Sequence, residues 1–308
     1  MILTVTLNPA IDRVYFVDNL DIGEVNRPAD MTYTAGGKGL NVSRVATLIG
    51  EKVDATGFVA GYNGQFICDD IQKIGIGNKF VQIDGETRIC INITDRSNGK
   101  STEVLEKGPV VSEADCDKFI DFYTKNISNY DVISISGSMP KGVPTDFYAK
   151  LVEIAKQQGK KIVVDTSGDA LVSVIKAKPY MVKPNKYELS KYLGREISTL
   201  DDVKAAAKEL FESGISFPVI SLGKDGCIAY IDNKCYHFIS PDVKTVNTVG
   251  SGDSFIAGVV AGLVRGMNGI DIMKLANACG TANTQFSQTG MVSKELVDKF
   301  FKEVVYTC

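Results

Sequence analysis

Short apolar runs alternate with longer amphipathic segments from about residue 110 onward. The apolar runs are Val132–Ser136, Ile162–Asp165, Tyr180–Lys183 and Val219–Leu222. Helical patterns lie between them, near residues 113–128, 144–158, 186–194 and 199–213. The second begins with a Pro-Thr pair, as helix starts often do. Strands that alternate with helices in this way are typical of parallel strands joined by helical crossovers. The pattern predicts an α/β fold, a three-layer α/β/α sandwich.

Two stretches, residues 12–33 and 86–107, depart from this rhythm because they combine strand-like alternation with charged and polar positions. In the second stretch Ile89, Ile91 and Ile93 alternate with arginine, cysteine and asparagine, which predicts one apolar face and one solvated face. We interpret the two stretches as a small β-sheet that serves as a lid or as a dimer surface. A homodimer through this lid is therefore expected.

The last third of the chain is helical by its period, from Ser251 to about Ser287 and again from Ser293 to Val305. With 308 residues and 44% hydrophobic content, the chain can bury one large core. We expect a single domain over residues 1–308.

Charge and cysteine content exclude several classes of protein. The formal net charge is −3, with 34 Lys and Arg against 37 Asp and Glu, so the chain has no bulk positive field for nucleic acid. The seven cysteines are scattered and include no Cys-x-x-Cys pair, which is typical of reduced thiols. Residues 1–17 alternate like a strand and carry no basic residue before Arg13, unlike a signal peptide. We expect a cytoplasmic protein that binds neither nucleic acid nor membrane.

The most informative segment is Asn247–Leu263, a glycine-rich loop that runs directly into an apolar helix. Glycines allow the backbone to turn its N–H groups toward one point, and a helix N-terminus adds positive potential there. The segment is therefore a candidate anion hole. A carboxylate inside such a hole would repel a bound phosphate, so Asp253 is better suited to act as a base beside the group being transferred. The alternative is a tight turn with Asp253 as an ordinary first-turn residue.

Two other glycine motifs fail on spacing. The Gly250-x-Gly252 pair begins a dinucleotide-type Gly-x-Gly-x-x-Gly pattern, but Phe255 occupies its last position. The single Gly-Lys-Ser, at residues 99–101, has Thr94 where the first glycine of a Walker loop belongs. Neither a dinucleotide fingerprint nor a P-loop is present.

A second glycine-rich segment, Thr34–Arg44, also precedes a helical pattern. Its Gly36 and Gly37 permit close approach of a ligand to the backbone. The ammonium of Lys38 and the amide of Asn41 suit phosphate and sugar hydroxyls. The alternative is a flexible turn with a solvated lysine.

The two segments, in this order, resemble the two motifs of the ribokinase-like (PfkB) carbohydrate kinases, and the resemblance extends over the whole chain. Further segments are similar to the branch that holds 1-phosphofructokinases and tagatose-6-phosphate kinases: residues 7–12, Thr87-Arg88, residues 136–140, 182–188 and 221–226. Residues 102–109 and the Ala-Gly-Gly-Lys-Gly-Leu-Asn-Val sequence at 35–42 favour tagatose-6-phosphate kinase. The resemblance implies a ribokinase-like fold with a small β-sheet lid and an ATP- and Mg²⁺-dependent kinase.

On the sugar side, the resemblance implies that three residues hold hydroxyls: Asp12, Gly37 and Asn41. It implies that three cations neutralise the phosphate already on the substrate: Arg27, Lys38 and Arg88. Arginine suits phosphate because its guanidinium is a planar fork of donors. Ser138 is a further candidate donor. The alternatives are solvated lid charges for the two arginines and simple turn chemistry for Ser138.

On the nucleotide side, the resemblance makes Lys183 and Asn185 phosphate contacts and Glu188 a ligand of a magnesium-bound water. It places Ser221, Gly223 and Gly226 beside ADP, and Asn277 and Gly280 near the adenine. The alternative for Asn185 and Glu188 is a capping box at a helix start, and both roles are compatible. In the transfer step Asp253 would take the proton, while the amides of Gly250, Ser251, Gly252 and Asp253 would stabilise the developing charge.

Many relatives carry Asp where this chain has Asn247 and Ala where it has Ser251. The loss of the acidic residue argues against the monovalent cation site that it would support. The expected reaction is conversion of tagatose 6-phosphate to tagatose 1,6-bisphosphate. The first alternative is phosphorylation of fructose 1-phosphate to fructose 1,6-bisphosphate. A non-catalytic sensor of nucleotide or sugar phosphate is an alternative of a different class.

Overall fold

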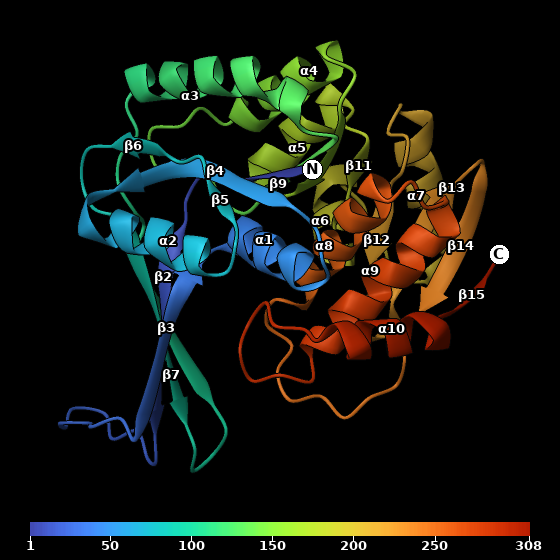
Figure 1. Ribbon diagram of the computed structural model, residues 1–308. Helices are drawn as coiled ribbons and strands as arrows, with labels where there is room; N and C mark the ends of the chain where they lie inside the picture. Colours follow the sequence, from blue (N-terminus) through green and yellow to red (C-terminus); the bar gives the residue numbers. More distant parts are fainter.

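A parallel sheet forms the centre of the computed structural model, which describes residues 1–308 (Figure 1). Its strands run in the order β11-β10-β9-β1-β4-β5, and β6 also pairs with β4. Their bounds are β1 Ile2–Thr6, β4 Val53–Ala60, β5 Gly77–Asn78, β6 Val81–Ile83, β9 Val132–Ser136, β10 Lys161–Asp165 and β11 Met181–Val182. The central strands are near-continuous apolar runs because both of their faces are buried.

Helices cover both faces of this sheet, which confirms the predicted three-layer sandwich. Alternate residues of β1 point into different cores: Ile2 joins one large apolar cluster and Leu3 the other. On one side lie α3 Glu113–Asn126, α4 Phe147–Gln157 and α5 Gly168–Ala177, with α6 Lys186–Leu193 and α7 Leu200–Glu212 packed on the same cluster. On the other lie α1 Lys38–Leu48, α8 Ser251–Val264, α9 Gly269–Asn283 and α10 Lys294–Glu303. The remaining helix, α2 Gly61–Lys73, packs on β4 and β3.

The helix starts show which local signals were reliable. Ser112, Asn185 and Thr199 each form a capping box at the start of α3, α6 and α7, within a residue of the predicted starts. Helix α4 begins at Phe147, three residues after the predicted start at 144, and its N-cap makes no side-chain hydrogen bond.

A second sheet corrects the prediction for Val219–Leu222. Strand β12 Val219–Ser221 pairs antiparallel with β13 Cys227–Ile231, followed by β14 Lys234–Ile239 and β15 Val305–Thr307. The segment of β12 still lies beside that of β11: the Phe217 amide donates to the Tyr180 carbonyl at 2.8 Å, the Ser221 amide donates to the Pro184 carbonyl at 3.1 Å, and Asn185 and Ser221 form a parallel bridge. The missed feature is the β13–β14 hairpin, whose turn residues Asp232 and Asn233 both have positive φ.

The C-terminal helical prediction also needs two corrections. The stretch from Ser251 to Ser287 is interrupted, because the chain turns at Gly266, with φ 67°, and α9 starts after Asn268 caps it. The final residues Val305–Thr307 are a strand rather than helix, because they pair with β14.

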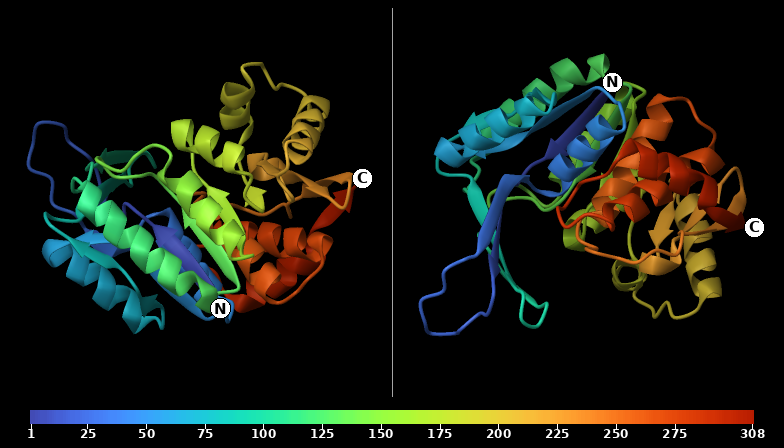
Figure 2. Two further views of the ribbon diagram at one scale, coloured as in Figure 1. Left: turned by 90° about the horizontal axis from the view of Figure 1, so that it is seen from above. Right: turned by 60° about the horizontal axis from the view of Figure 1, so that its bottom comes forward.

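The lid is confirmed as a separate four-stranded sheet of order β3-β2-β7-β8, with bounds β2 Ala10–Val17, β3 Asp30–Gly36, β7 Arg88–Asp95 and β8 Ser101–Leu105. It projects from the body as a long ribbon (Figure 1, Figure 2). The predicted solvated face of β7 is wrong, because the polar residues of the strand are half-buried like the isoleucines that alternate with them. The lid packs on the body toward its inner end, through Ile11, Ala35 and Ile89 and through Tyr33 against Phe66 of α2.

No helix combines the length and apolar character that crossing a bilayer requires.

Candidate active site

The two glycine-rich segments meet at the carboxyl-end side of the sheet, where α1 and α8 begin and pack against each other (Figure 1). The amide Nδ2 of Asn41 donates to Oδ2 of Asp253 at 2.8 Å, across 212 residues of sequence. Each helix thus delivers one polar side chain from its first turn to a shared point. The contact brings together the residues that the sequence singled out as base and as sugar ligand.

Asp253 is buried, and its surroundings bring the pKa of its carboxyl close to neutral pH. Burial raises the pKa of its carboxyl to about 7, with the negative charge of Asp165 acting in the same direction. The hydrogen bond from Asn41 and the charges of Lys38 and Lys183 oppose this shift. A base that is half ionised near pH 7 is well matched to accepting a hydroxyl proton.

The buried carboxylate of Asp165 was not predicted as a site residue. Its Oδ1 lies 3.3 Å from the ammonium of Lys183, and its Oδ2 lies 3.9 Å from that of Lys38. It therefore holds the two predicted cations, one from each side of the site, at a common point. The available signal was its place at the end of the predicted strand Ile162–Asp165, because ligands of parallel α/β sheets bind at the carboxyl ends of strands.

The loop before α8 is shaped as an anion hole. Gly250 has φ 82°, and a Cβ there would lie 2.6 Å from the methyl group of Thr289. The amides of Gly250, Gly252 and Asp253 donate to no acceptor in the structure, as expected at an open helix N-terminus. The amide of Ser251 donates to the Thr248 carbonyl at 3.2 Å, so it does not contribute a free donor as predicted.

Neighbouring residues fix this loop through hydrogen bonds. The side chain of Asn283 donates to the Val249 carbonyl and accepts from the Gly290 amide, each at 2.9 Å. Gly252 lies beside Lys183, since a Cβ built on it would be 3.6 Å from the ammonium. An anion above this loop would thus meet free amides and a lysine together.

On the sugar side, Asp12 lies at the inner end of the lid. Its carboxylate covers Gly36 so closely that a Cβ there would be 2.0 Å from an oxygen, so any side chain at this position would displace the carboxylate. Burial raises the pKa of Asp12 to about 6, although Arg44, Arg88 and the Gly37 amide oppose the shift. Gly37 is the N-cap of α1 and has φ 106°, a conformation that favours glycine.

Arg88 is fixed beside Asp12 by backbone carbonyls. Its Nε and Nη2 donate to the Asn8 carbonyl at 3.2 and 2.9 Å, and its Nη1 donates to the Glu106 carbonyl at 3.3 Å. Lys38 has a half-exposed side chain, and Ser138 is exposed in the turn after β9. The turn that carries Ser138 lies beside Lys38, since a Cβ built on Gly137 would be 3.6 Å from the Lys38 Cβ.

The structure does not bring Arg27 to the other two cations of the predicted clamp. It is exposed in the loop 18–29, at the outer end of the lid (Figure 2). The register pairs Arg88 with Ala10 at the inner end and Asp30 with Phe16 at the outer end. Six residues of strand separate these pairs by about 20 Å. Within one chain, Arg27 and Arg88 therefore cannot hold one phosphate together.

On the nucleotide side, both proposed roles of Asn185 and Glu188 are compatible with the structure. The side chain of Asn185 accepts from the Glu188 amide and that of Glu188 accepts from the Asn185 amide, each at 2.9 Å. One Glu188 oxygen makes this bond, and the charge of the carboxylate still acts on Lys38. No group of three or more His, Cys, Asp or Glu side chains is arranged to hold a metal. A single carboxylate nevertheless fits Mg²⁺, which takes most of its ligands from water and phosphate and would neutralise phosphate charge here.

The residues predicted beside ADP and those predicted near the adenine form two groups. Ser221, Gly223 and Gly226 lie around the end of β12, and Gly223 faces open space. Asn277 is buried, and its amide is already engaged: Nδ2 donates to the Met273 carbonyl at 2.8 Å and Oδ1 accepts from Ser240 at 3.1 Å. Asn277 therefore ties α9 to Ser240 rather than presenting a free amide.

Gly280 has a packing role. A Cβ on Gly280 would lie 3.2 Å from the Ser251 carbonyl oxygen. Its missing side chain thus allows α9 to approach the loop that carries Asp253.

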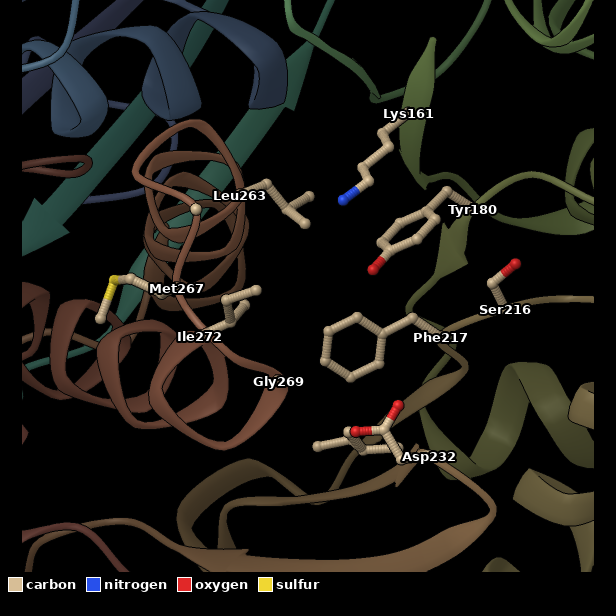
Figure 3. A pocket seen from close by; sticks show the side chains of 11 residues that line it. Lys161, Tyr180, Ser216, Phe217, Asp232, Leu263, Met267, Gly269 and Ile272 are labelled. Carbon is tan, nitrogen blue, oxygen red and sulfur yellow. The ribbon is translucent and has the colours of Figure 1, made fainter. Parts of the chain in front are cut away.

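A separate cavity of about 190 Å³ lies at the other end of α8 (Figure 3). Lys161 and Tyr180 line one side of it, and Leu263 and Ile272 line the other. Leu263 is ten residues beyond Asp253, about 15 Å along the helix. This cavity is therefore distinct from the site around the base.

The comparisons with known proteins agree with this geometry. Residues 5–295 match the model of the pfkB family of carbohydrate kinases. The chain belongs to that family. It is therefore a kinase that transfers phosphate from ATP to a sugar.

Solved structures resemble it over their full length. A Staphylococcus aureus protein assigned as a phosphofructokinase is 34% identical, with a TM-score of 0.87 and coverage of 100% of this chain and 98% of that chain. A Thermotoga maritima protein assigned as a 1-phosphofructokinase is 30% identical, with a TM-score of 0.91 and coverage of 100% and 99%. Phosphofructokinase-2 from Escherichia coli, in complex with potassium, is 27% identical, with a TM-score of 0.91 and coverage of 98% of each chain.

Proposed function

We propose that this kinase phosphorylates an exocyclic hydroxyl of a ketohexose phosphate. The preferred acceptor is tagatose 6-phosphate, and the alternative is fructose 1-phosphate. The observation that carries the proposal is the buried Asp253, with a pKa of about 7, placed beside free amides and two lysines. A carboxylate in that position is useful to an enzyme that must remove a proton next to a transferring phosphoryl group.

The chain's own residues divide the transfer step among them. Asp253 accepts the proton of the attacking hydroxyl, and Asn41 holds its carboxylate at 2.8 Å in a fixed orientation. The free amides of Gly250, Gly252 and Asp253 face the charge that develops on the phosphoryl oxygens. Lys183 adds a positive charge, and Asp165 keeps its ammonium beside Gly252. The developing charge is thus met by groups already in position.

The cations at the inner end of the lid support a substrate that already carries a phosphate. Arg88 and Lys38 border the site, and Arg88 is held rigidly by the Asn8 and Glu106 carbonyls. Two similar proteins are assigned as a phosphofructokinase and a 1-phosphofructokinase, and both names denote kinases of phosphorylated sugars. Within one chain the lid holds Arg27 away from Arg88. The Arg27 that completes the phosphate site would therefore come from a second copy of the chain.

A dimer through the lid would suit the exposed apolar residues on this sheet. They are Met31, Tyr33, Val104 and Leu105. Strand β8 is exposed over its whole length, so the lid has an uncovered face and an edge strand. In such a dimer, the loop 18–29 of one copy would approach the site of the other.

The choice between the two sugar phosphates depends on one hydroxyl. In the furanose form, either exocyclic arm can carry the phosphate while the other reacts, and tagatose and fructose differ only at C4. An unpaired hydroxyl contact costs about 1–3 kcal/mol, roughly ten- to hundredfold in specificity. We therefore expect activity on both, with tagatose 6-phosphate preferred.

The test is ADP release with a panel of acceptors: tagatose 6-phosphate, fructose 1-phosphate, fructose 6-phosphate, free fructose and free ribose. A higher kcat/KM for a free sugar than for any sugar phosphate would refute the phosphate-binding site. Binding of ATP and sugar phosphate without ADP release would instead indicate a sensor. The base at Asp253 argues against a sensor, since a sensor needs the pocket but not the base.

A further inference from the structure

Arg44 is a buried arginine whose guanidinium joins three separate parts of the candidate active site. It lies on α1, one turn after Asn41, and is only 7% exposed. Nη1 donates to Oδ1 of Asn41 at 3.1 Å and to the Thr289 carbonyl at 3.4 Å, while Nη2 donates to the Ala35 carbonyl. Ala35 belongs to lid strand β3, and Thr289 packs against Gly250. One side chain thus links the base's partner, the lid and the glycine loop.

The chemistry of these contacts fixes which way the Asn41 amide points. A guanidinium has only donors, so its neighbour must be the amide oxygen of Asn41. The nitrogen of the amide is then directed to Asp253, where the contact is 2.8 Å. With the amide reversed, its oxygen would face the carboxylate and its nitrogen would face the guanidinium, and both contacts would be repulsive. Arg44 therefore selects the orientation in which Asp253 receives a hydrogen bond.

We propose that Arg44 is the positioning residue of the catalytic base: it holds Asn41 so that the amide nitrogen donates to Asp253 and keeps the base ionised. The inference rests on the proposed role of Asp253 as the base. Arg44 acts through Asn41 rather than on the reacting atoms, because the hydrogen bonds of its guanidinium go to Asn41, Ala35 and Thr289.

The charged groups around both residues define what else sets this ionisation. Lys38 from α1, Lys183 after β11 and Asp165 at the end of β10 act directly on Asp253. Arg44 itself faces the carboxylates of Asp12 and Asp70, which favour its charged form although burial lowers its pKa. Removing Arg44 would leave those three groups in place, so their effects on Asp253 would remain. The change in the pKa of Asp253 would then report the lost orientation of the Asn41 amide.

The test is the pH profile of kcat in Arg44→Met and Arg44→Lys. Loss of one hydrogen bond to a carboxylate raises its pKa by about one unit. The acidic limb of the Arg44→Met profile should therefore move up by about one pH unit. The resulting drop in kcat is about fivefold at pH 7 and largely disappears by pH 9. Arg44→Lys keeps a donor and a charge, so its limb should lie between those of Arg44→Met and the wild type.

The matched control is Arg265→Met. Arg265 also uses its guanidinium to join α1 to α8, since it donates to the Ile49 carbonyl and to Glu51, each at 2.7 Å. It lies at the far end of α8 from Asp253. Its loss should lower stability but leave the acidic limb where it is in the wild type. A limb that moves equally in both variants would overturn the proposal.

A double variant separates orientation from stability. In Asn41→Ala the amide is gone, so adding Arg44→Lys should produce no further shift of the limb. An additive shift would contradict the proposal, as would Arg44 variants that lose kcat equally at all pH values. If Arg44→Met does not fold, Arg44→Lys and the double variant still decide the question. An Asp253→Asn variant that remains active would instead refute the proposed role of Asp253 as the base.

Discussion

The floor of the site and the lid hold their polar residues in opposite ways. On the floor, Asp253, Asp165 and Lys183 are all buried, and each is in contact with a defined partner. On the lid, Arg27 is exposed in a loop, and the sheet packs on the body toward its inner end. The difference indicates a division of labour: groups that handle the proton and phosphoryl charge are fixed before substrate arrives. Those that recognise the acceptor lie partly on an element that needs a further contact.

The largest expected effect is on the floor. Asp253→Asn should keep the fold and ATP binding but lower kcat by at least about 10²-fold, the usual scale for loss of a positioned base. Steady-state kinetics at saturating substrates measure the change, and ATP binding measured separately shows that the pocket is intact. Retention of more than about half the wild-type kcat would remove Asp253 from the mechanism.

The next effect tests the inner end of the lid. Arg88→Ala should raise KM for the sugar phosphate by about tenfold or more while leaving KM for ATP nearly unchanged, because its charge faces the acceptor side. Arg96→Ala is the control on the same sheet: its guanidinium stacks on Phe16, 5.4 Å from the ring centre, and lies near Asp18, at the outer end. Equal rises in both Michaelis constants for Arg88→Ala would contradict the assignment.

A smaller effect tests the outer end of the lid. If a second copy supplies Arg27, Arg27→Ala should raise KM for the sugar phosphate a few-fold, about 1 kcal/mol, as expected for a partly solvated charge. Mixing Arg27→Ala chains with Asp253→Asn chains should restore activity in mixed dimers, because one site of each then combines an intact Asp253 with an intact Arg27 from the other chain. Subunit mixing with activity measurement checks this. An Arg27→Ala enzyme with wild-type kinetics would show that the loop does not reach the acceptor.

A further effect, on stability rather than kinetics, concerns the pH dependence of unfolding. Because the folded pKa of Asp253 is raised to about 7 from 3.8, the unfolded chain releases this proton first as pH rises. The contribution of Asp253 to the stability of the wild type is therefore fully present below pH 4 and is lost as the pH rises through 7. Asp253→Asn removes the loss, so its free energy of unfolding should exceed that of wild type by about 1–3 kcal/mol at pH 8.

Thermal unfolding of both proteins at pH 5 and pH 8 measures this difference. The advantage of the variant should be clearly smaller at pH 5, where the folded carboxyl is mostly protonated. An advantage that is the same at both pH values would mean that the carboxyl of Asp253 is not held in a raised-pKa environment.

Local signals in the sequence were reliable where one segment decides its own structure. The run Val132–Ser136 is a strand with the predicted bounds, and the Asn185–Glu188 pair forms the capping box that was weighed against a metal role. The glycine loop before Asp253 opens a helix as predicted. Backbone geometry, capping and hydrophobic period involve neighbours within a few residues, so their information lies in the segment itself.

Pairing between distant segments was less predictable. The run Val219–Leu222 resembles the other buried strands, yet β12 joins an antiparallel sheet because the β13–β14 hairpin occupies its other side. The residues of β7 alternate like a strand with one covered and one solvated face, but both faces are half-buried. Period alone indicates that a strand forms but not which partners lie on each face.

The sequence by itself determined the family, the α/β layers, the two glycine segments and the identity of the candidate base. Only the tertiary structure decided that Asn41 contacts Asp253, that Asp165 joins Lys38 to Lys183, that Arg44 directs the Asn41 amide, and that Arg27 stands apart. The physical reason is that proton affinity depends on burial and on charges a few ångströms away. Those neighbours come from strands and helices that are distant in the chain and meet only when the sheet assembles.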